Sequence, residues 1–295
     1  MNIIKPPKLK TGDTIGIIAT SGPIEKASIE VSNAVKFFKS RGFNVLISDD
    51  IYENDRYLAG SDEIRLKNLH EFFKNDNVNA IICLRGGYGA IRLVNKIDYE
   101  LIRNNPKIFC GYSDITALNL MLYKRAGLVT YSGPMIMSDF GCEDISNFTI
   151  CEFFNSVSEE NQIIKGESSI ITGEAEGILW GGNLSTIVSL GGLDFVPDEP
   201  FIFFTEDVSE PVYKLDKMFN QLLNIKKFRQ NIRALCFGEF TNTDKPEWLN
   251  ILFEELAKEL NIPTAKEFKF SHEKDKTTVP IGAKAKLKGN ILYIE

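Results

Sequence analysis

Short apolar runs alternate with amphipathic stretches through the first half of the chain. Uninterrupted apolar runs of this kind, separated by helical periodicity, are typical of parallel strands that are buried on both faces. The predicted strands are residues 14–19, 44–48, 78–84, 107–111 and 129–132. The predicted helices are residues 26–41, which Gly42 ends, 61–73, which Ser61 opens, and 114–124. This order predicts an α/β domain built on a parallel sheet.

The alternation loosens after that point. Residues 139–173 mix acidic and polar side chains with one short helical signal. Beyond them we predict strands at 176–180, 201–205 and 234–237, helices at 213–223 and 246–260, and a closing hairpin that turns at Lys288-Gly289-Asn290. We therefore expect an N-terminal parallel-sheet α/β domain in residues 1–145, a linker region in 146–172, and a C-terminal β-rich α+β domain in 173–295.

Length and charge narrow the class of protein. The chain has 295 residues, 34 Lys and Arg against 40 Asp and Glu, and a net charge of −6. The length suits two domains, and the acidic balance argues against nucleic-acid or membrane-surface binding, which needs basic patches. The segment Met1–Pro7 lacks the apolar core of a secretion signal, and no uncharged run is long enough to span a bilayer. We therefore expect a cytoplasmic protein.

The cysteines and histidines argue against a bound metal or cofactor. The five cysteines have no CxxC spacing, and Cys83, Cys110 and Cys236 lie in apolar runs where a thiol usually packs as a small hydrophobe. The two histidines, His70 and His272, show no HExxH or HxH spacing. There is no GxGxxG turn either, so we expect neither a metal nor a nucleotide cofactor.

Two turns lie where an α/β sheet collects its ligands, beyond the carboxyl ends of strands. The turn Arg85-Gly86-Gly87-Tyr88-Gly89 lets the backbone approach a ligand, or is simply a tight turn. In Gly111-Tyr112-Ser113-Asp114 the serine resembles a nucleophile elbow, although Ile115 replaces the second glycine of GxSxG. Alternatively, Ser113 caps the following helix.

A nucleophilic serine needs a base, and usually an acid that orients the base. His70 lies within a predicted helix, where a partly exposed structural histidine is the ordinary case. His272 lies in a polar loop that no packing pattern explains, so it is the candidate base. Glu206 directly follows the apolar run 201–205 and is the candidate orienting acid, although a strand-end acid is often structural. Its neighbour Asp207 is a candidate cap for the next helix.

Taken together, these segments resemble the LD-carboxypeptidase family of serine peptidases along nearly the whole chain. The resemblance is carried by Lys8-Leu9-Lys10-Thr11-Gly12-Asp13, Ser21-Gly22-Pro23, residues 85–89 and 111–116, Gly181-Gly182-Asn183-Leu184, Thr205-Glu206-Asp207, and His272 followed by Val279-Pro280-Ile281-Gly282-Ala283. It implies a Ser113–Glu206–His272 triad and an oxyanion hole formed by the backbone N–H groups of Gly87 and Asp114. Further candidate substrate-binding residues are Arg85, Gly86, Asn183 and Trp180. The resemblance also implies a homodimer with its site between the two domains.

Within this family two activities compete. Tetrapeptide carboxypeptidases release the terminal D-Ala from a cytoplasmic murein tetrapeptide, and immunity-type relatives cleave an aminoacyl linkage in a peptide–nucleotide antibiotic. Immunity-type members carry an insertion and a Gly-Gly-Cys-Leu-Glu variant, whereas this chain reads Gly181-Gly182-Asn183-Leu184-Ser185, which favours the carboxypeptidase. Trp180 is placed where it could stack a base, although it could also pack. A different class, a non-catalytic protein that binds a small peptide or nucleotide, would treat Ser113 as a cap.

Overall fold

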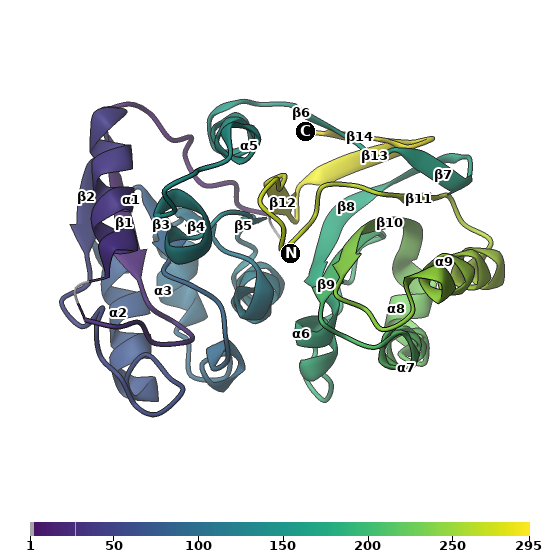
Figure 1. Ribbon diagram of the computed structural model, residues 1–295, viewed down its shortest axis with the longest axis horizontal. Helices are drawn as coiled ribbons and strands as arrows, with labels where there is room; N and C mark the ends of the chain where they lie inside the picture. Colours follow the sequence, from purple (N-terminus) through teal and green to yellow (C-terminus); the bar gives the residue numbers. More distant parts are fainter. Residues whose placement is uncertain (1–2, 27) are drawn as a thin grey trace.

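Two β-sheets lie side by side, each with its own helices, and together they organise the chain (Figure 1). The computed structural model describes residues 3–26 and 28–295. Met1 and Asn2 of the N-terminal segment, and residue 27 of the predicted helix 26–41, lie outside the described residues. The architecture confirms the predicted fold class, an α/β half followed by a β-rich half.

The first sheet has the strand order β12-β5-β4-β3-β1-β2. Its strands are β1 (Thr14–Ile18), β2 (Asn44–Ile47), β3 (Ala80–Cys83), β4 (Ile108–Cys110), β5 (Thr130–Ser132) and β12 (Val279–Ile281). The first five are parallel, as the alternation predicts, and only β12 runs antiparallel, against β5. Parallel strands carry their carboxyl ends to one edge, and this places the turns that follow β1, β3 and β4 together.

Helices and helical turns cover this sheet. They are α1 (Ile29–Ser40), α2 (Asp62–Lys74), η1 (Ala90–Arg92), α3 (Tyr99–Asn104), η2 (Ser113–Ile115), α4 (Thr116–Met121), η3 (Leu122–Ala126), η4 (Ile136–Phe140) and α5 (Asn147–Ser158). Ser61 caps α2 through a hydrogen bond from the N–H of Ile64. The helix predicted over residues 114–124 is a succession of 3₁₀, α and π turns.

The second sheet is mixed and has the order β6-β14-β13-β8-β9-β10-β11-β7. Its strands are β6 (Gln162–Lys165), β7 (Ser168–Ile171), β8 (Glu174–Asn183), β9 (Phe201–Val208), β10 (Ile232–Thr241), β11 (Thr264–Lys266), β13 (Lys284–Lys288) and β14 (Ile291–Ile294). The strands from β8 to β11 are parallel, and the others are antiparallel. Its helices are α6 (Leu184–Ser189), α7 (Val212–Leu223), α8 (Lys226–Asn231) and α9 (Pro246–Leu260), the last with the predicted bounds.

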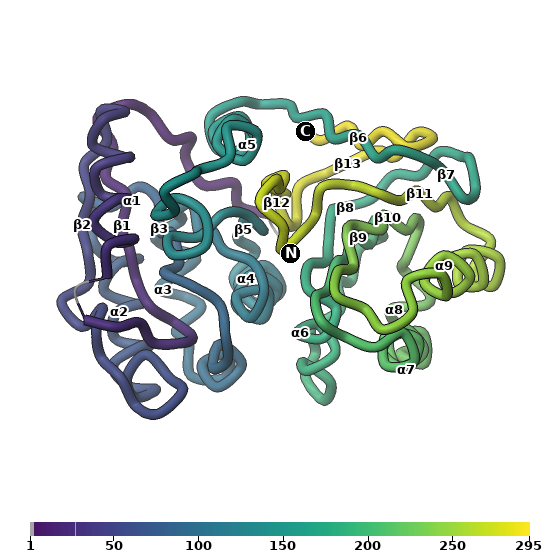
Figure 2. The backbone as a smooth tube through the Cα atoms, in the orientation of Figure 1, coloured from purple at the N-terminus to yellow at the C-terminus, as the bar shows by residue number. Residues whose placement is uncertain are grey.

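The chain passes between the two halves more often than the sequence suggests. Residues 146–172, expected to be a linker, are folded: α5 packs Phe153 against Phe140 of η4, and β6 and β7 form the two edges of the second sheet. Near the C-terminus, β12 returns to the first sheet and covers the open edge of β5 before β13 rejoins the second (Figure 2). This crossing positions the loop that precedes β12, because each of its ends is fixed to a different part of the molecule.

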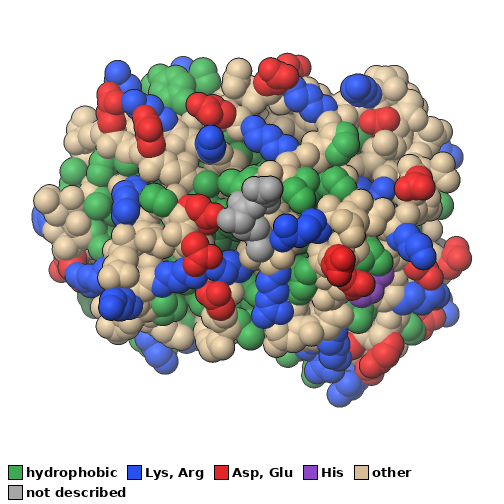
Figure 3. Space-filling view, turned by 180° about the vertical axis from the view of Figure 1, so that it is seen from behind, with side chains coloured by type: hydrophobic (Ala, Val, Ile, Leu, Met, Phe, Trp, Pro, Cys, Tyr) green, Lys and Arg blue, Asp and Glu red, His purple; other side chains and the backbone are tan. Residues whose placement is uncertain are grey.

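The interior and the surface agree with an ordinary globular composition. Cys83, Cys110 and Cys236 are fully buried, as predicted, and unpaired. On the face shown in Figure 3, basic and acidic side chains are interspersed over both halves. In the part of the chain that the structure describes, no helix combines the length and the apolar character needed to cross a membrane.

Candidate active site

Ser113 follows β4 in a strained backbone conformation. Its φ is 61°, in the left-handed region that a residue with a Cβ adopts at a cost of about 1–3 kcal/mol. Tyr112 is the N-cap residue of η2, and no side chain caps that turn. The structure therefore does not support the interpretation of Ser113 as a helix cap. A sharp strand-to-helix turn with the serine at its apex is the geometry of a nucleophile elbow.

The side chain of Asp114 ties this elbow to two other turns. Its Oδ2 accepts hydrogen bonds from the Ser21 hydroxyl at 2.5 Å and from the N–H of Ala90 at 2.9 Å. Ser21 lies after β1 and Ala90 after the glycine turn that follows β3, so one buried carboxylate joins three strand ends. Burial raises the pKa of Asp114, and the bond from Ser21 only partly opposes it.

Arg65 supports the same turns from within the fold. Its guanidinium is fully buried and donates to the carbonyls of Thr20 at 2.6 Å and Gly89 at 2.9 Å. It also pairs with Asp62 at 2.5 Å. The sequence analysis missed this residue, although an arginine on the apolar face of a predicted helix was a usable signal.

The glycine turn after β3 lies directly against Ser113. A Cβ at Gly86 would lie 3.0 Å from Ser113 Cβ and 3.1 Å from its Oγ, which is closer than ordinary packing. Gly87 has φ 123° and faces the backbone of Gly22. Arg85 is exposed, and its Nη1 donates to the carbonyl of Pro23 at 3.2 Å. The turn therefore brings bare backbone next to the serine, which a ligand-binding turn requires.

Glu206 and His272 form a hydrogen-bonded pair. His272 Nδ1 and Glu206 Oε2 lie 2.6 Å apart, with the carboxylate almost fully buried and the imidazole 17% exposed. Burial opposes a charge on the imidazole, but the hydrogen bond and the negative charge of Glu206 outweigh it and raise the pKa of His272. The other ring nitrogen, Nε2, can therefore act as a general base.

The two halves of the candidate site meet through Tyr112 and Thr116. The Tyr112 ring lies edge-on to His272, with centroids 4.9 Å apart. The Thr116 hydroxyl accepts from the N–H of Asn183 at 3.2 Å, and the missing side chain of Gly182 makes room for Thr116. Among the described residues, no hydrogen bond joins Ser113 to His272. The serine and the pair thus lie on elements that meet through Tyr112, with no hydrogen bond between them among the described residues.

Asn183, a predicted substrate contact, is engaged within the protein. It is nearly buried, caps α6 by accepting from the N–H of Thr186, and donates to Asp207 at 3.1 Å. Asp207 also accepts from the N–H of Ser185, so it supports α6 and not the next helix, α7, that the sequence suggested. Burial, with the nearby charge of Glu206, raises the pKa of Asp207 to about 6.

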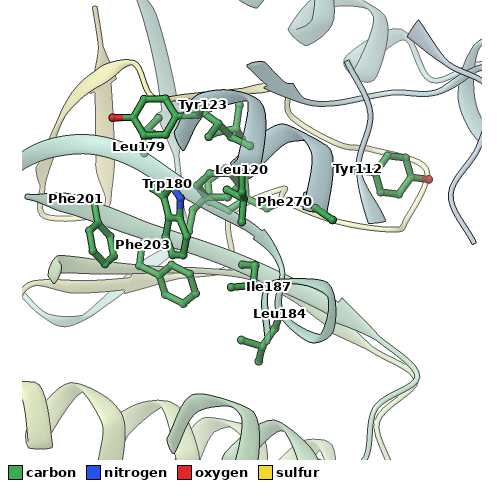
Figure 4. Close-up of a cluster of buried hydrophobic side chains, with 14 of the residues drawn as sticks. Tyr112, Leu120, Tyr123, Leu179, Trp180, Leu184, Ile187, Phe201, Phe203 and Phe270 are labelled. Atoms are coloured by element: carbon green, nitrogen blue, oxygen red, sulfur yellow. The ribbon is translucent and has the colours of Figure 1, made fainter. Parts of the chain in front are cut away.

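Trp180 does not contact the site. Its side chain is fully buried and packs against Phe195, Phe201, Phe203 and Phe228. Figure 4 shows it beside Phe201 and Phe203. The prediction that Trp180 binds substrate is therefore wrong, because an indole with no accessible surface cannot stack on a ligand. An aromatic residue before a glycine turn gives no indication in the sequence of which way it faces.

A hollow of about 360 Å³ opens beside His272. It lies between the loop of His272 and the segment 138–149, and Ser138, Cys142, Lys274 and Lys276 are among its lining residues. A larger hollow, of about 710 Å³, lies along β6, β13 and β14 and includes none of the predicted site residues. The described residues contain no cluster of His, Cys, Asp and Glu suited to a metal ion.

His70 has a structural place. It lies on α2, and its Nε2 accepts a hydrogen bond from the N–H of Asp98, the cap of α3, at 3.0 Å. Of the two histidines, His272 is the one that pairs with a carboxylate, that of Glu206 near the end of β9. Lys276 and Asp139, which pack near it, were missed by the sequence analysis, and no spacing in their segments marks them.

The two halves of the chain match two family models. Residues 15–133 match the LD-carboxypeptidase N-terminal domain, and residues 176–287 match the LD-carboxypeptidase C-terminal domain. A probable murein peptide carboxypeptidase of Bacillus subtilis is 36% identical over 95% of this chain and 90% of its own. Among solved structures, an MccF-like protein of Bacillus anthracis aligns with a TM-score of 0.91, 32% identity and 99% of both chains. A muramoyltetrapeptide carboxypeptidase of Oxalobacter formigenes aligns with a TM-score of 0.84, 31% identity, 95% of this chain and 97% of its own.

Proposed function

The chain belongs to the LD-carboxypeptidase family of serine peptidases, and from this premise we propose that it releases the terminal D-Ala from a murein tetrapeptide. The bond cleaved joins an L-centre to a D-centre, and the third residue of the peptide is either diaminopimelate or lysine. The observation that carries the proposal is the buried Glu206–His272 pair, at 2.6 Å, whose imidazole packs against Tyr112, the residue before the strained Ser113.

In the proposed reaction, Ser113 Oγ attacks the carbonyl carbon before D-Ala while His272 accepts the hydroxyl proton. The imidazolium that forms is stabilised by Glu206, which also holds the Nδ1–H tautomer. His272 then gives the proton to the departing amine of D-Ala. Water attacks the acyl-enzyme with His272 again as base, and the shortened peptide leaves.

We assign the oxyanion hole to the backbone N–H groups of Gly87 and Asp114. The close approach of residues 86–87 to Ser113 supports this, as does the anchoring of Asp114 to Ser21 and Ala90. Such preorganised donors stabilise the tetrahedral intermediate. Of the candidate substrate contacts, exposed Arg85 remains suited to a carboxylate, and Gly86 acts by leaving space.

The test is incubation of the protein with murein tetrapeptide, with products identified by mass. We expect D-Ala release by the parent and by His70→Ala, and none by Ser113→Ala, Glu206→Ala or His272→Ala. The His70 variant is the matched control, because it removes the other imidazole. Undiminished D-Ala release by Ser113→Ala would overturn the serine mechanism.

The second candidate is hydrolysis of an aminoacyl-nucleotide antibiotic, which the likeness to the MccF-like protein of Bacillus anthracis favours. The same assay includes an aminoacyl-sulfamoyl adenosine beside the tetrapeptide. Release of the amino acid from this compound alone would select the immunity-type activity. The buried position of Trp180 removes the stacking contact that we had considered in its favour.

We propose further that the protein acts in the cytoplasm, on peptide released during wall recycling, and as a homodimer. We propose the domain division at 1–145 and 173–295, which separates Ser113 from Glu206 and His272; residues 146–172 between them are folded as α5, β6 and β7. Gel filtration with light scattering tests the dimer. Limited proteolysis tests the division, which requires that the first cleavage fall in the loops between these elements.

A further inference from the structure

A buried ion pair lies close to the candidate base. Lys276 and Asp139 pair directly, and each side chain is at most 4% exposed. Asp139 also accepts hydrogen bonds from the N–H of Met135 at 2.8 Å and from the Ser138 hydroxyl at 2.9 Å. Burying two charges costs more than their attraction commonly returns, so a pair of this kind is weak support for stability alone.

The pair reaches the candidate base through Tyr112. The ammonium of Lys276 lies 4.9 Å from the centroid of the Tyr112 ring, and that ring lies edge-on to His272. The Tyr112 hydroxyl donates to Ser138 at 3.0 Å, which returns to Asp139. Tyr112 is thus held at its hydroxyl and over its ring, immediately before Ser113.

The loop that carries His272 is closed and anchored around the same lysine. The N–H of Thr277 donates to the carbonyl of Lys269 at 2.7 Å, and the N–H of Lys276 donates to the Thr149 hydroxyl at 2.9 Å. Ser271 donates to Glu239 at 2.5 Å on the side of the second sheet. Lys276 is therefore where this loop meets the first half of the molecule.

We propose that Lys276 is a positioning residue: seated between Asp139 and Tyr112, it holds the Tyr112 ring against His272 and places a buried positive charge near the imidazole. The proposal rests on the proposed function for its catalytic meaning. The Lys276–Asp139 pair then has a role other than stabilising the fold. A nearby cation disfavours the protonated imidazole, so it keeps His272 neutral and able to act as a base.

Several charged and titratable groups face His272. Glu206 and Asp207 approach it from β9, Tyr112 from the end of β4, and Asp139, Cys142, Asp144, Glu273, Lys274 and Lys276 surround the hollow that it lines. The acids of β9 raise the pKa of His272, whereas Lys276 lowers it. Burial is the largest effect that lowers the pKa of His272, and the charge of Lys276 adds to burial in opposing Glu206 and Asp207.

The experiment measures the pKa of His272 directly, without substrate. A His70→Gln background leaves one histidine, whose ring is titrated by NMR. We expect Lys276→Met to raise the pKa of His272 by roughly half to one pH unit. Lys276→Arg keeps the charge and should restore the parent value. Lys274→Met is the matched control on the same loop; its ammonium and its partner Asp144 are both exposed, so solvent screens this charge and the change in the His272 pKa should be clearly smaller.

Because Lys276→Met leaves Asp139 buried without its cationic partner, the double variant Lys276→Met with Asp139→Asn is measured as well. A smaller rise in the His272 pKa is expected from it, since the negative charge of Asp139 is removed together with the positive charge of Lys276. A His272 pKa equal to the parent value in both variants overturns the proposal. Tyr112→Leu, which removes the ring, should lower kcat with KM unchanged, and Tyr112→Phe, which keeps the ring and loses only the bond to Ser138, should lower kcat less. If the parent protein releases no D-Ala but the expected changes in the His272 pKa are observed, the proposed function alone is rejected.

Discussion

Gly86 and Ser113 lie so close that a single added methyl group would touch the serine. A Cβ at Gly86 would lie 3.0 Å from Ser113 Cβ and 3.1 Å from Oγ. The serine cannot easily yield, because its backbone already sits at φ 61° and Asp114 fixes the next residue to Ser21 and Ala90. The turn after β3 and the elbow after β4 therefore constrain each other.

Gly86→Ala should consequently impair turnover more than folding. Gly86 does not have a left-handed φ, so alanine fits the backbone and the effect comes from crowding of the serine hydroxyl. We expect kcat to fall by roughly tenfold to a hundredfold, since small misplacements of reacting groups are costly. Gly191→Ala is the control, with similar crowding at 3.2 Å against the carbonyl of Val188. Equal activity of the two variants would show that Gly86 does not define the site.

The pH dependence of turnover should depend on Glu206. The pKa of His272 is raised above its ordinary value of about 6.5, and the base works only when neutral, so kcat/KM should fall as pH drops through that raised pKa. Glu206→Gln removes the charge that raises it, so this acid limb should move to lower pH. In addition, kcat should fall roughly 10²- to 10⁴-fold as the imidazolium loses its partner.

The same substitution has a consequence for stability. A group with a raised folded pKa contributes stability below its unfolded pKa and loses it as pH rises through the folded pKa. The stability difference between the parent and Glu206→Gln, measured by urea unfolding, should therefore be larger near pH 6 than near pH 9.

The control for the pH dependence of turnover is Glu239→Gln. Glu239 accepts a hydrogen bond from Ser271, on the loop of His272, and its substitution should leave the acid limb of kcat/KM in place. An unmoved limb in Glu206→Gln would argue against the pair.

Trp180 should behave as a core residue and not as a ligand contact. Its side chain is fully buried among phenylalanines, so Trp180→Ala should cost about 3–5 kcal/mol of unfolding free energy. Trp180→Phe should cost less, because among the described residues the buried indole N–H has no hydrogen-bond partner to lose. Both effects are measured by urea unfolding, with KM determined beside them. A raised KM with an unchanged free energy of unfolding would instead indicate that Trp180 contacts the substrate.

Much of the fold was predictable because its signals are local. Apolar runs between helices predict the parallel strands β1 to β5, and Pro246 with the following periodicity predicts α9. The strand β12 was not predictable, since three residues, Val279–Ile281, carry no signal of their own and pair with β5 across a long stretch of chain. Residues 146–172 resembled a linker because their strands β6 and β7 are short sheet edges: β6 alternates buried and exposed positions, and no residue of β7 is fully buried.

The residues of the candidate site also fall into two groups, those with a local sequence signal and those that depend on contacts in the folded chain. Scarcity of histidine and the strand-end position of an acid were enough to select His272 and Glu206, which the structure joins by a hydrogen bond. Arg65 could have been found from its place on the apolar face of a predicted helix. Lys276 acts through a contact made only in the folded chain, so no spacing reveals it. Burial, which decides the role of Trp180, is likewise a property of the assembled core.

Asp62 should make the stability of the N-terminal half depend on acid pH. It is 8% exposed and accepts from Arg65, Arg92 and Lys96, at 2.5, 2.8 and 2.8 Å, and the bond from Arg92 is the largest of the effects that hold its pKa well below the usual range. A carboxyl group whose pKa is depressed in the folded state stabilises the fold at a pH above its unfolded-state pKa of about 3.9, and this stabilisation is lost as the pH falls through the folded-state pKa. Asp62→Asn should thus be less stable than the parent at pH 7, and the difference in free energy of unfolding should shrink below about pH 4. Asp55→Asn, which removes an exposed pair with Arg56, is the control and should change little. The free energies of unfolding of the parent and of Asp62→Asn are measured with urea between pH 7 and pH 3. A difference between them that does not change with pH would mean that Asp62 acts through its shape and not through its charge.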